Sequence, residues 1–261
     1  VTAIYGKKTP DGYIKIGETI YENLSFRAKG MVGKNVEFYY KNDNTIPQLI
    51  SLKEKHNSEV VINGSSDYFL DFAEGTYYVD QDGDRNKFKI GKEYILVYND
   101  VLIDGSDESL MSPQTGSVRL LDNDGDGIYD VVFVDEYFNL IVKQYNTFDR
   151  TFYDMKDAKR KFALDDFEKV TFQEADKTLQ PENIEANAIL SIKKTPRGEE
   201  TQVLVSSKKK SGVLTLIDRN NITIGNDTYK VSNDFRTDFS GLTPGTEYVF
   251  YLDSFNEIVY Y

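Results

Sequence analysis

The sequence predicts a mainly all-β protein, built from tandem small β-barrel or β-sandwich modules with short helices at most. The 261 residues include 19 Tyr and 16 Phe but no Trp, and such aromatic residues favour pleated, half-buried strands. Apolar and polar residues alternate in short runs, which is the periodicity of a strand. Gly, Asn and Asp residues bound these runs, as is typical of tight turns.

The alternating runs follow one another along the whole chain, so strands are expected throughout. They are residues 13–16, 36–40, 93–98, 118–121, 131–134, 189–192, 202–205, 222–224 and 248–251. The strongest helical candidate is the segment 155–167, which is rich in Lys, Asp and Ala. It lacks a sustained apolar stripe, so it is equally compatible with an irregular connection.

Polar and charged clusters interrupt the strand pattern near residues 57–66, 146–149 and 206–211. Clusters of this kind mark connections between structural units. We therefore expect four β modules, and the third of them is either a module or a connection. Their bounds are 1–62, 63–148, 149–208 and 209–261. The run Lys208-Lys209-Lys210 is expected to be a solvated edge or linker.

The two ends of the chain resemble each other. The segment Ile14-Lys15-Ile16-Gly17 with Tyr21 matches Ile222-Thr223-Ile224-Gly225 with Tyr229 at the same spacing. After a four-residue difference in length, Gly33, Phe38-Tyr39 and Asn44 match Gly245, Phe250-Tyr251 and Asn256. We expect residues 12–53 and 220–261 to share one strand order, unless hairpins with Gly turns are alike by chance.

Charge and composition exclude several classes of function. With 31 basic and 43 acidic residues the net charge is −12, which repels nucleic acid and anionic membrane surfaces. No cysteine is present, which excludes disulfides, thiolate nucleophiles and zinc-thiolate sites. No apolar run approaches the roughly 18 residues that span a bilayer. The chain begins with Val1, which suggests a processed product or a segment of a longer protein.

An acidic loop between two apolar runs is the most specific local pattern. In a calcium loop, side chains at positions 1, 3 and 5 converge, Gly at position 6 allows a sharp turn, and a carbonyl at position 7 faces the ion. Position 9 completes the set of ligands. A structural Ca²⁺ is therefore a candidate cofactor, and the alternative is a plain acidic turn. The predicted ligands are Asp122, Asp124, Asp126, the carbonyl of Ile128, and Asp130.

The loop differs from an EF-hand, because Phe133 stands where position 12 requires a bidentate Glu. It resembles the shorter D-x-D-x-D-G-x-x-D loops between strands in integrin-type propellers and other extracellular repeat proteins. A second acidic cluster, residues 80–84, lacks the Gly and Asp that would follow, so we expect it to be a turn.

The residue types that most catalytic sites need are missing or isolated. His56 is the only histidine, and no G-x-S-x-G pattern presents a serine to it. No phosphate-binding loop or dinucleotide fingerprint occurs. Among 43 acidic residues, nothing in the sequence singles out a pair for glycoside hydrolysis. We therefore expect no enzymatic activity.

Residues 116–137, with the apolar runs and acidic loop given above, are similar to a recurring segment of large bacterial surface proteins that carry S-layer homology domains. They also resemble segments of structural proteins of bacteriophages that infect such bacteria. Residues 189–192, 203–207, 211–213 and 222–253 resemble the next parts of the same array. The S-layer homology domains themselves are absent from these residues.

The resemblance implies a structural and assembly protein of a virion or of a bacterial cell surface. Its partners would be neighbouring virion or surface-layer subunits, with homo-oligomers as one form, and the virion is favoured slightly. The alternative is an extracellular glycan- or receptor-binding module that uses exposed tyrosines such as Tyr77-Tyr78 or Tyr260-Tyr261. Tyrosine on strands more often serves packing.

Overall fold

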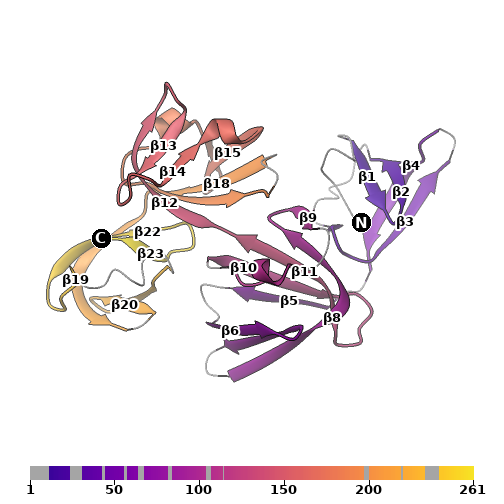
Figure 1. Ribbon diagram of the computed structural model, residues 1–261, viewed down its shortest axis with the longest axis horizontal. Coiled ribbons are helices and arrows are strands. Elements are labelled where there is room, and N and C mark those ends of the chain that lie inside the picture. The colour runs from indigo at the N-terminus through magenta and orange to yellow at the C-terminus, as the bar shows by residue number, and fades with distance from the viewer. Residues whose placement is uncertain are drawn as a thin grey trace. The chain divides into compact units, whose positions relative to one another are not determined.

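The structure is a computed structural model, and its described part is all-β, as the sequence predicts. The described strands form four sheets, two of them half-barrels (Figure 1). The only helical elements in this part are short 3-10 turns, and none of its helices has the length and hydropathy to cross a membrane. The described residues are 12–23, 31–42, 45–55, 58–63, 68–81, 84–103, 107–113, 115–196, 200–218, 220–232 and 241–261.

The first sheet has the strand order β1-β2-β4-β3. Strands β1 (Tyr13–Ile16) and β2 (Thr19–Glu22) form a hairpin, and β3 (Val36–Lys41) pairs antiparallel with β4 (Gln48–Glu54). A parallel contact between Glu22 and Gln48 joins the two pairs. The core of this sheet consists of Ile14, Tyr21 and Leu49, with Ile16, Phe38 and Leu52 packed against it.

The second sheet has the order β5-β10-β11-β8-β7-β6, and β9 also pairs with β8. Its central strand, β8 (Asp84–Tyr98), is long because its first half pairs with β7 and its second half pairs with β9 and β11. The β11 pairing is parallel. The other strands are β5 (Ser58–Asn63), β6 (Tyr68–Ala73), β7 (Thr76–Gln81), β9 (Val101–Ile103), β10 (Gly116–Asp122) and β11 (Tyr129–Glu136).

The third sheet has the order β14-β13-β12-β17-β18-β15-β16. Its strands are β12 (Phe138–Asn146), β13 (Thr151–Asp154), β14 (Lys161–Ala163), β15 (Lys169–Glu174), β16 (Lys177–Leu179), β17 (Ile189–Lys194) and β18 (Glu200–Ser206). The segment 155–167 contains turns, β14 and the 3-10 turn Leu164–Asp166. The helical interpretation of this segment is therefore wrong, and the missing apolar stripe is the physical reason.

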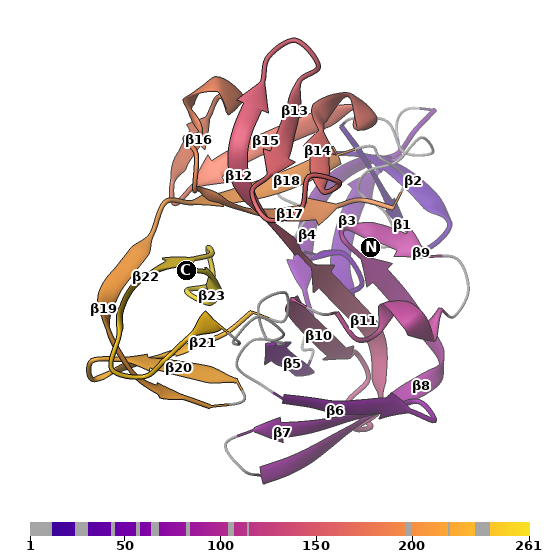
Figure 2. The same ribbon diagram turned by 60° about the vertical axis from the view of Figure 1, so that its left-hand side comes forward.

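The fourth sheet has the order β21-β20-β19-β22-β23. Figure 2 shows β19 (Lys209–Ile217) as a long bent strand that runs beside β22 (Glu247–Leu252) and meets β20 (Asn221–Ile224) at its other end. Strand β21 (Asp227–Lys230) forms a hairpin with β20, and β23 (Ile258–Tyr260) pairs with β22. An isolated parallel bridge joins Val231, directly after β21, to Ile258 on β23.

The first and fourth sheets share the strand pairs that the internal repeat matches, although their full strand orders differ. Ile14 pairs with Tyr21 in the first hairpin, and Ile222 pairs with Tyr229 in the second. Tyr39 lies on β3 and Tyr251 on β22, and each of these strands pairs antiparallel with the strand that follows it. The matched residues therefore occupy matched strands.

Contacts divide the chain into two compact units. The first unit comprises 1–62, 67–112 and 118–134, and the second comprises 63–66, 113–117 and 135–261. The sheets themselves extend over 13–54, 58–136, 138–206 and 209–260. Because β5 pairs with β10, residues 58–62 belong to the second sheet, whereas the sequence assigned them to the first module. Strand β12 likewise begins the third sheet, ahead of the predicted bound at 149.

Candidate functional site

The acidic loop connects β10 to β11, which are neighbours in the second sheet. Apolar side chains on both strands, among them Val118, Leu120, Val132 and Val134, are fully or almost fully buried. They anchor both ends of the loop in the core, so the polar residues between them project from the end of the strand pair.

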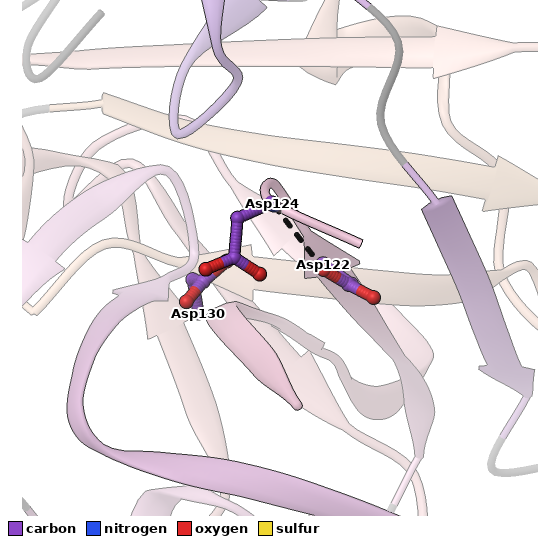
Figure 3. A group of neighbouring side chains, drawn as sticks. All are labelled: Asp122, Asp124 and Asp130. Atoms are coloured by element: carbon purple, nitrogen blue, oxygen red, sulfur yellow. Dashed lines mark hydrogen bonds between the residues drawn. The ribbon is translucent and has the colours of Figure 1, made fainter. Parts of the chain in front are cut away.

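Three of the predicted ligands come together in this loop. One carboxylate oxygen each from Asp122, Asp124 and Asp130 lies within 4.8 Å of the others. Figure 3 shows the three side chains, and the dashed line marks the hydrogen bond from the Asp124 amide to Asp122. Oxygens that bind one Ca²⁺ at about 2.4 Å lie at most about 4.8 Å apart. The spacing of the three carboxylates is therefore compatible with a shared ion.

The fourth predicted carboxylate, Asp126, is placed differently. Asp126 is exposed, does not belong to the group of three, and accepts a 2.7 Å hydrogen bond from the amide of Ile128. That bond forms a local turn in which the Asp126 carboxylate caps its own backbone. The amide of Ile128 is engaged in this turn, whereas the predicted ligand atom is its carbonyl, so that ligand stays a prediction.

Backbone amides stabilise the charge of Asp122. Its Oδ1 accepts from Gly125 at 2.6 Å and from Asp124 at 3.3 Å, and its Oδ2 accepts from Gly127 at 3.0 Å. Burial alone raises the pKa of Asp122, but these hydrogen bonds outweigh it and the net pKa is lowered. Asp122 is therefore ionised at neutral pH although the residue is buried.

The donor set of the loop suits a hard cation. It offers three carboxylates and no nitrogen or sulfur ligand, which is the chemistry that Ca²⁺ selects. The same residues also form a self-consistent turn, because Asp130 accepts from the amide of Asn123 at 2.8 Å and Asp124 accepts from that of Asp126 at 3.2 Å. The geometry thus fits both an ion site and an acidic turn.

Asn123 gives the loop a second role, which the sequence did not reveal. Its Oδ1 accepts from the amide of Asn35 at 3.2 Å, and its Nδ2 donates to the carbonyl of Gly33 at 2.9 Å. The Asn35 side chain in turn donates to the Asn123 carbonyl at 2.8 Å. These bonds join the acidic loop to the segment that precedes β3, so the loop is also a junction between the first and second sheets.

Close packing reinforces this junction. Gly33 has a positive φ of 74°, and a Cβ built on it would lie 2.8 Å from Cγ1 of Val131 and 2.9 Å from Cζ of Phe133. Val131 and Phe133 belong to a small core with Val97 and Leu121, and Val32 packs against it. Only glycine combines the required backbone conformation with this close approach.

A buried polar network connects the third and fourth sheets, which lie in the second unit. Nδ2 of Asn139 on β12 donates to Oδ2 of Asp253 at 3.2 Å, and Ser191 on β17 donates to Oδ1 of Asn139 at 2.8 Å. The amides of Phe255 and Glu257 each donate to Oδ1 of Asp253 at 2.9 Å. Desolvation raises the pKa of Asp253 to about 6, although these hydrogen bonds and the charge of Lys208 oppose the shift.

Apolar contacts accompany the network. Ile141 and Ile189 of the third sheet are buried together with Val259 of the fourth, and Tyr251 and Tyr260 pack against them. In addition, Ser206 donates a 2.7 Å hydrogen bond to the Leu252 carbonyl. This junction is therefore closed by both polar and apolar contacts.

A cleft of about 350 Å³ lies on the third sheet. Aromatic and aliphatic side chains, among them Tyr145, Phe167 and Phe172, line one part of it, while Glu168 and Glu182 add carboxylates. Arg150 also lines the cleft and is paired with Asp165 at 2.7 Å. The lining therefore combines aromatic and aliphatic side chains with charged groups.

The tyrosines that the sequence offered for glycan binding are mostly engaged in packing. Tyr77 is fully buried and donates to the Met111 carbonyl at 2.7 Å. Tyr260 and Tyr261 are half-buried and pack against each other, with ring centroids 6.3 Å apart. Tyr78 is half-buried as well. Burial removes Tyr77 from that interpretation.

The predicted lysine run, residues 208–210, lies at the start of the fourth sheet. Lys209 and Lys210 lie on β19, and Lys210 pairs with Asp227 at 2.6 Å. Lys208 donates to the side chain of Asn256 at 2.7 Å. Lys209 and Lys210 therefore belong to the fourth sheet, whereas Lys208 lies in the connection between β18 and β19. His56, Asp82 and Gly83 lie outside the described residues.

Comparison of the chain with protein-family models and with curated proteins finds no match.

Proposed function

We propose that the chain is a non-enzymatic structural and assembly protein of a surface, either a bacteriophage virion component or an S-layer-type surface protein. In this role its β modules form stiff elements and contact neighbouring subunits. No nucleic acid or membrane takes part in these contacts, which agrees with the net charge of −12.

The observation that supports this proposal most directly is the way successive sheets are joined. Within the first unit, Asn123 binds Gly33 and Asn35. Within the second unit, Asn139 binds Asp253. A chain of independent binding domains needs only loose linkers, and domain motion is then the default. Specific side-chain junctions hold neighbouring sheets in one geometry, which suits a load-bearing element.

Calcium has a structural role in this proposal. An ion held by Asp122, Asp124 and Asp130 would neutralise three neighbouring carboxylates and fix the loop that carries Asn123. Because the ion binds only the folded loop, it would stabilise the junction between the first two sheets.

Immunogold electron microscopy tests the proposal. An antibody raised against the chain is applied to cell envelopes and to phage particles from the same culture. We expect gold at a regular spacing on one of the two surfaces, and prior addition of the purified chain should abolish the label. Label confined to the cell interior would contradict a surface role.

The cleft on the third sheet favours a second candidate, an extracellular glycan-binding module. Phe167 lines this cleft and is only partly buried, and one side of its ring packs against Phe162 with ring centroids 5.5 Å apart. We infer that the exposed part of the ring stacks on a sugar face. Titration calorimetry with soluble wall-glycan fragments tests this function. Binding that Phe167→Ala weakens and Phe148→Ala leaves unchanged would support it, since Phe148 is 96% exposed and does not line the cleft.

A further inference from the structure

The third and fourth sheets share one arrangement of five strands. In the fourth sheet, β19 pairs with β22 through its first half and with β20 through its second half, and β21 and β23 lie outside these strands. In the third sheet, β12 pairs in the same way with β17 and β13, and β14 and β18 lie outside them. The third sheet therefore contains the five strands of the fourth, together with the added strands β15 and β16.

The cleft on the third sheet is formed mostly by this added segment. After β14 the chain makes the 3-10 turn Leu164–Asp166 and continues into β15, which pairs parallel with β18 and antiparallel with β16. At the same place in the fourth sheet, Val231 makes an isolated parallel bridge to Ile258. Binding residues concentrate in connecting segments that a rigid scaffold positions. The lining residues that the added segment supplies are Glu168, 170–172 and 178–182.

The size and the uncharged groups of the cleft suit a short stretch of a saccharide. Sites for small ligands span about 300–1,000 Å³, and this cleft has a volume of about 350 Å³. Thr171, Thr178 and Gln180 line it with groups that both donate and accept hydrogen bonds. Phe167 adds a partly buried ring. A sugar has hydroxyl groups around an apolar ring face, so both parts of it find a matching group.

The charges along the cleft do not cancel. The positive charge of Arg150 is offset by Asp165, with which it pairs at 2.7 Å. Glu168 and Glu182 also line the cleft, and both are exposed. The other lining residues are uncharged. The cleft therefore has a net negative charge, which attracts a cationic group and repels a carboxylate or a phosphate.

We propose that the cleft binds a saccharide with free amino groups, as in a glucosamine oligomer, whose ammonium groups pair with Glu168 and Glu182 while a sugar face lies on Phe167. The charge distinguishes this ligand from other saccharides, because an N-acetylated sugar is neutral and a uronate is repelled. This inference rests on the second candidate function, glycan binding, for which it names the class of glycan.

Calorimetric titration of the full chain with three tetramers tests the inference. The tetramers consist of glucosamine, N-acetylglucosamine and galacturonic acid, and the titration is done at mildly acidic pH, where the amino groups of glucosamine are protonated. The glucosamine tetramer should bind about five- to tenfold more tightly than the N-acetylglucosamine tetramer, since exposed ion pairs contribute modestly. The galacturonic acid tetramer should bind most weakly. Salt at about 0.5 M should remove most of the preference for glucosamine.

Variants locate the binding in the cleft. Glu168→Gln should reduce the preference for glucosamine, and Glu182→Lys should reverse it in favour of the neutral tetramer. Glu247→Gln is the matched control, because Glu247 is exposed on β22 and does not line the cleft. It should retain the preference of the parent. This control separates binding in the cleft from the general attraction of a cation to a chain with a net charge of −12. Melting temperatures equal to that of the parent establish that the variants are folded.

The remaining outcomes overturn the inference in distinguishable ways. Equal affinity of the parent for the glucosamine and N-acetylglucosamine tetramers would remove the preference for amino groups and leave glycan binding in place. Absence of binding for all three tetramers would remove glycan binding as well. A preference for glucosamine that Glu182→Lys leaves unchanged would show a general attraction of charge and no site in the cleft.

Discussion

Asn139 and Asp253 are 114 positions apart in the sequence, yet Nδ2 of the Asn139 side chain donates a 3.2 Å hydrogen bond to the Asp253 carboxylate. Both residues are almost completely buried, at 2% and 0% exposure. The bond connects β12 to the turn after β22, so the titration of one buried carboxyl group bears on the contact between two sheets.

The first prediction concerns pH. The pKa of Asp253 is raised by burial from 3.8 to about 6 in the folded protein, so folding favours the protonated form. The contribution of protonated Asp253 to the stability of the folded protein is therefore complete below about pH 4. It is lost as the pH rises to about 6. The free energy of unfolding should fall across this window by on the order of 3 kcal/mol.

Urea denaturation of the parent and of Asp253→Asn at pH 4, 5, 6 and 7 measures this effect. The variant has no carboxyl group at this position and should lack the decrease. Asp122 does not affect the comparison, because its pKa is lowered. Its contribution to the free energy of unfolding is lost only at more acidic pH. Identical pH profiles for parent and variant would contradict the prediction.

The second prediction concerns calcium. Saturating Ca²⁺ should raise the melting temperature of the parent relative to a chelator, with a stabilisation of roughly 2.7 kcal/mol at a hundredfold excess over Kd. Asp124→Ala should abolish the difference, because Asp124 belongs to the group of three carboxylates. Asp126→Ala is the matched control and should retain it. A parent whose melting temperature is the same in calcium and in chelator has no ion site in this loop.

The third prediction concerns the junction at Asn123. Asn123→Ala removes the side-chain bonds to Asn35 and Gly33, and we expect a loss of about 1–2 kcal/mol, since each bond contributes about 0.5–1.5 kcal/mol. Amide exchange at Asn35 should accelerate as well. Asn226→Ala, on an exposed turn of the fourth sheet, is the control. Unchanged exchange at Asn35 would show that the junction does not depend on this side chain.

The fourth prediction separates backbone strain from packing at Gly33. Gly33→Ala and Gly17→Ala both place alanine at a positive φ, 74° and 57° respectively, which costs about 1 kcal/mol or more. Only Gly33 is crowded, by Val131 and Phe133, whereas no atom lies within 4 Å of a Cβ on Gly17. Gly33→Ala should therefore be more destabilising by about 1–3 kcal/mol. Equal urea midpoints for the two variants would refute the packing argument.

The alternation of apolar and polar residues predicted the strands well, because it indicates which side chains face a core. The run at 13–16 coincides with β1, and the run at 131–134 lies within β11. The pattern did not reveal that β8 continues from Asp84 to Tyr98, because that length comes from pairing with three other strands. Register between strands distant in the chain is a tertiary property.

The candidate site was predicted in part for a similar reason. The alternating aspartates indicated a loop in which carboxylates converge, and Asp122, Asp124 and Asp130 do converge. Asp126 instead binds the neighbouring amide of Ile128, a local competition that spacing alone does not reveal. The role of Asn123 was missed, because its partners Gly33 and Asn35 lie about 90 positions away in the chain.

The parallel pairs β8–β11 and β15–β18 have a consequence for how the protein folds. Val97 has to pair with Phe133 before the second sheet is complete, and Val170 has to pair with Thr201 before the third sheet is complete. A hairpin such as β20–β21 closes over a two-residue turn, whereas these pairs close over loops of about thirty residues at a larger entropic cost. The hairpins should therefore form early, and the long-range parallel pairs should limit the rate at which each unit reaches its native state.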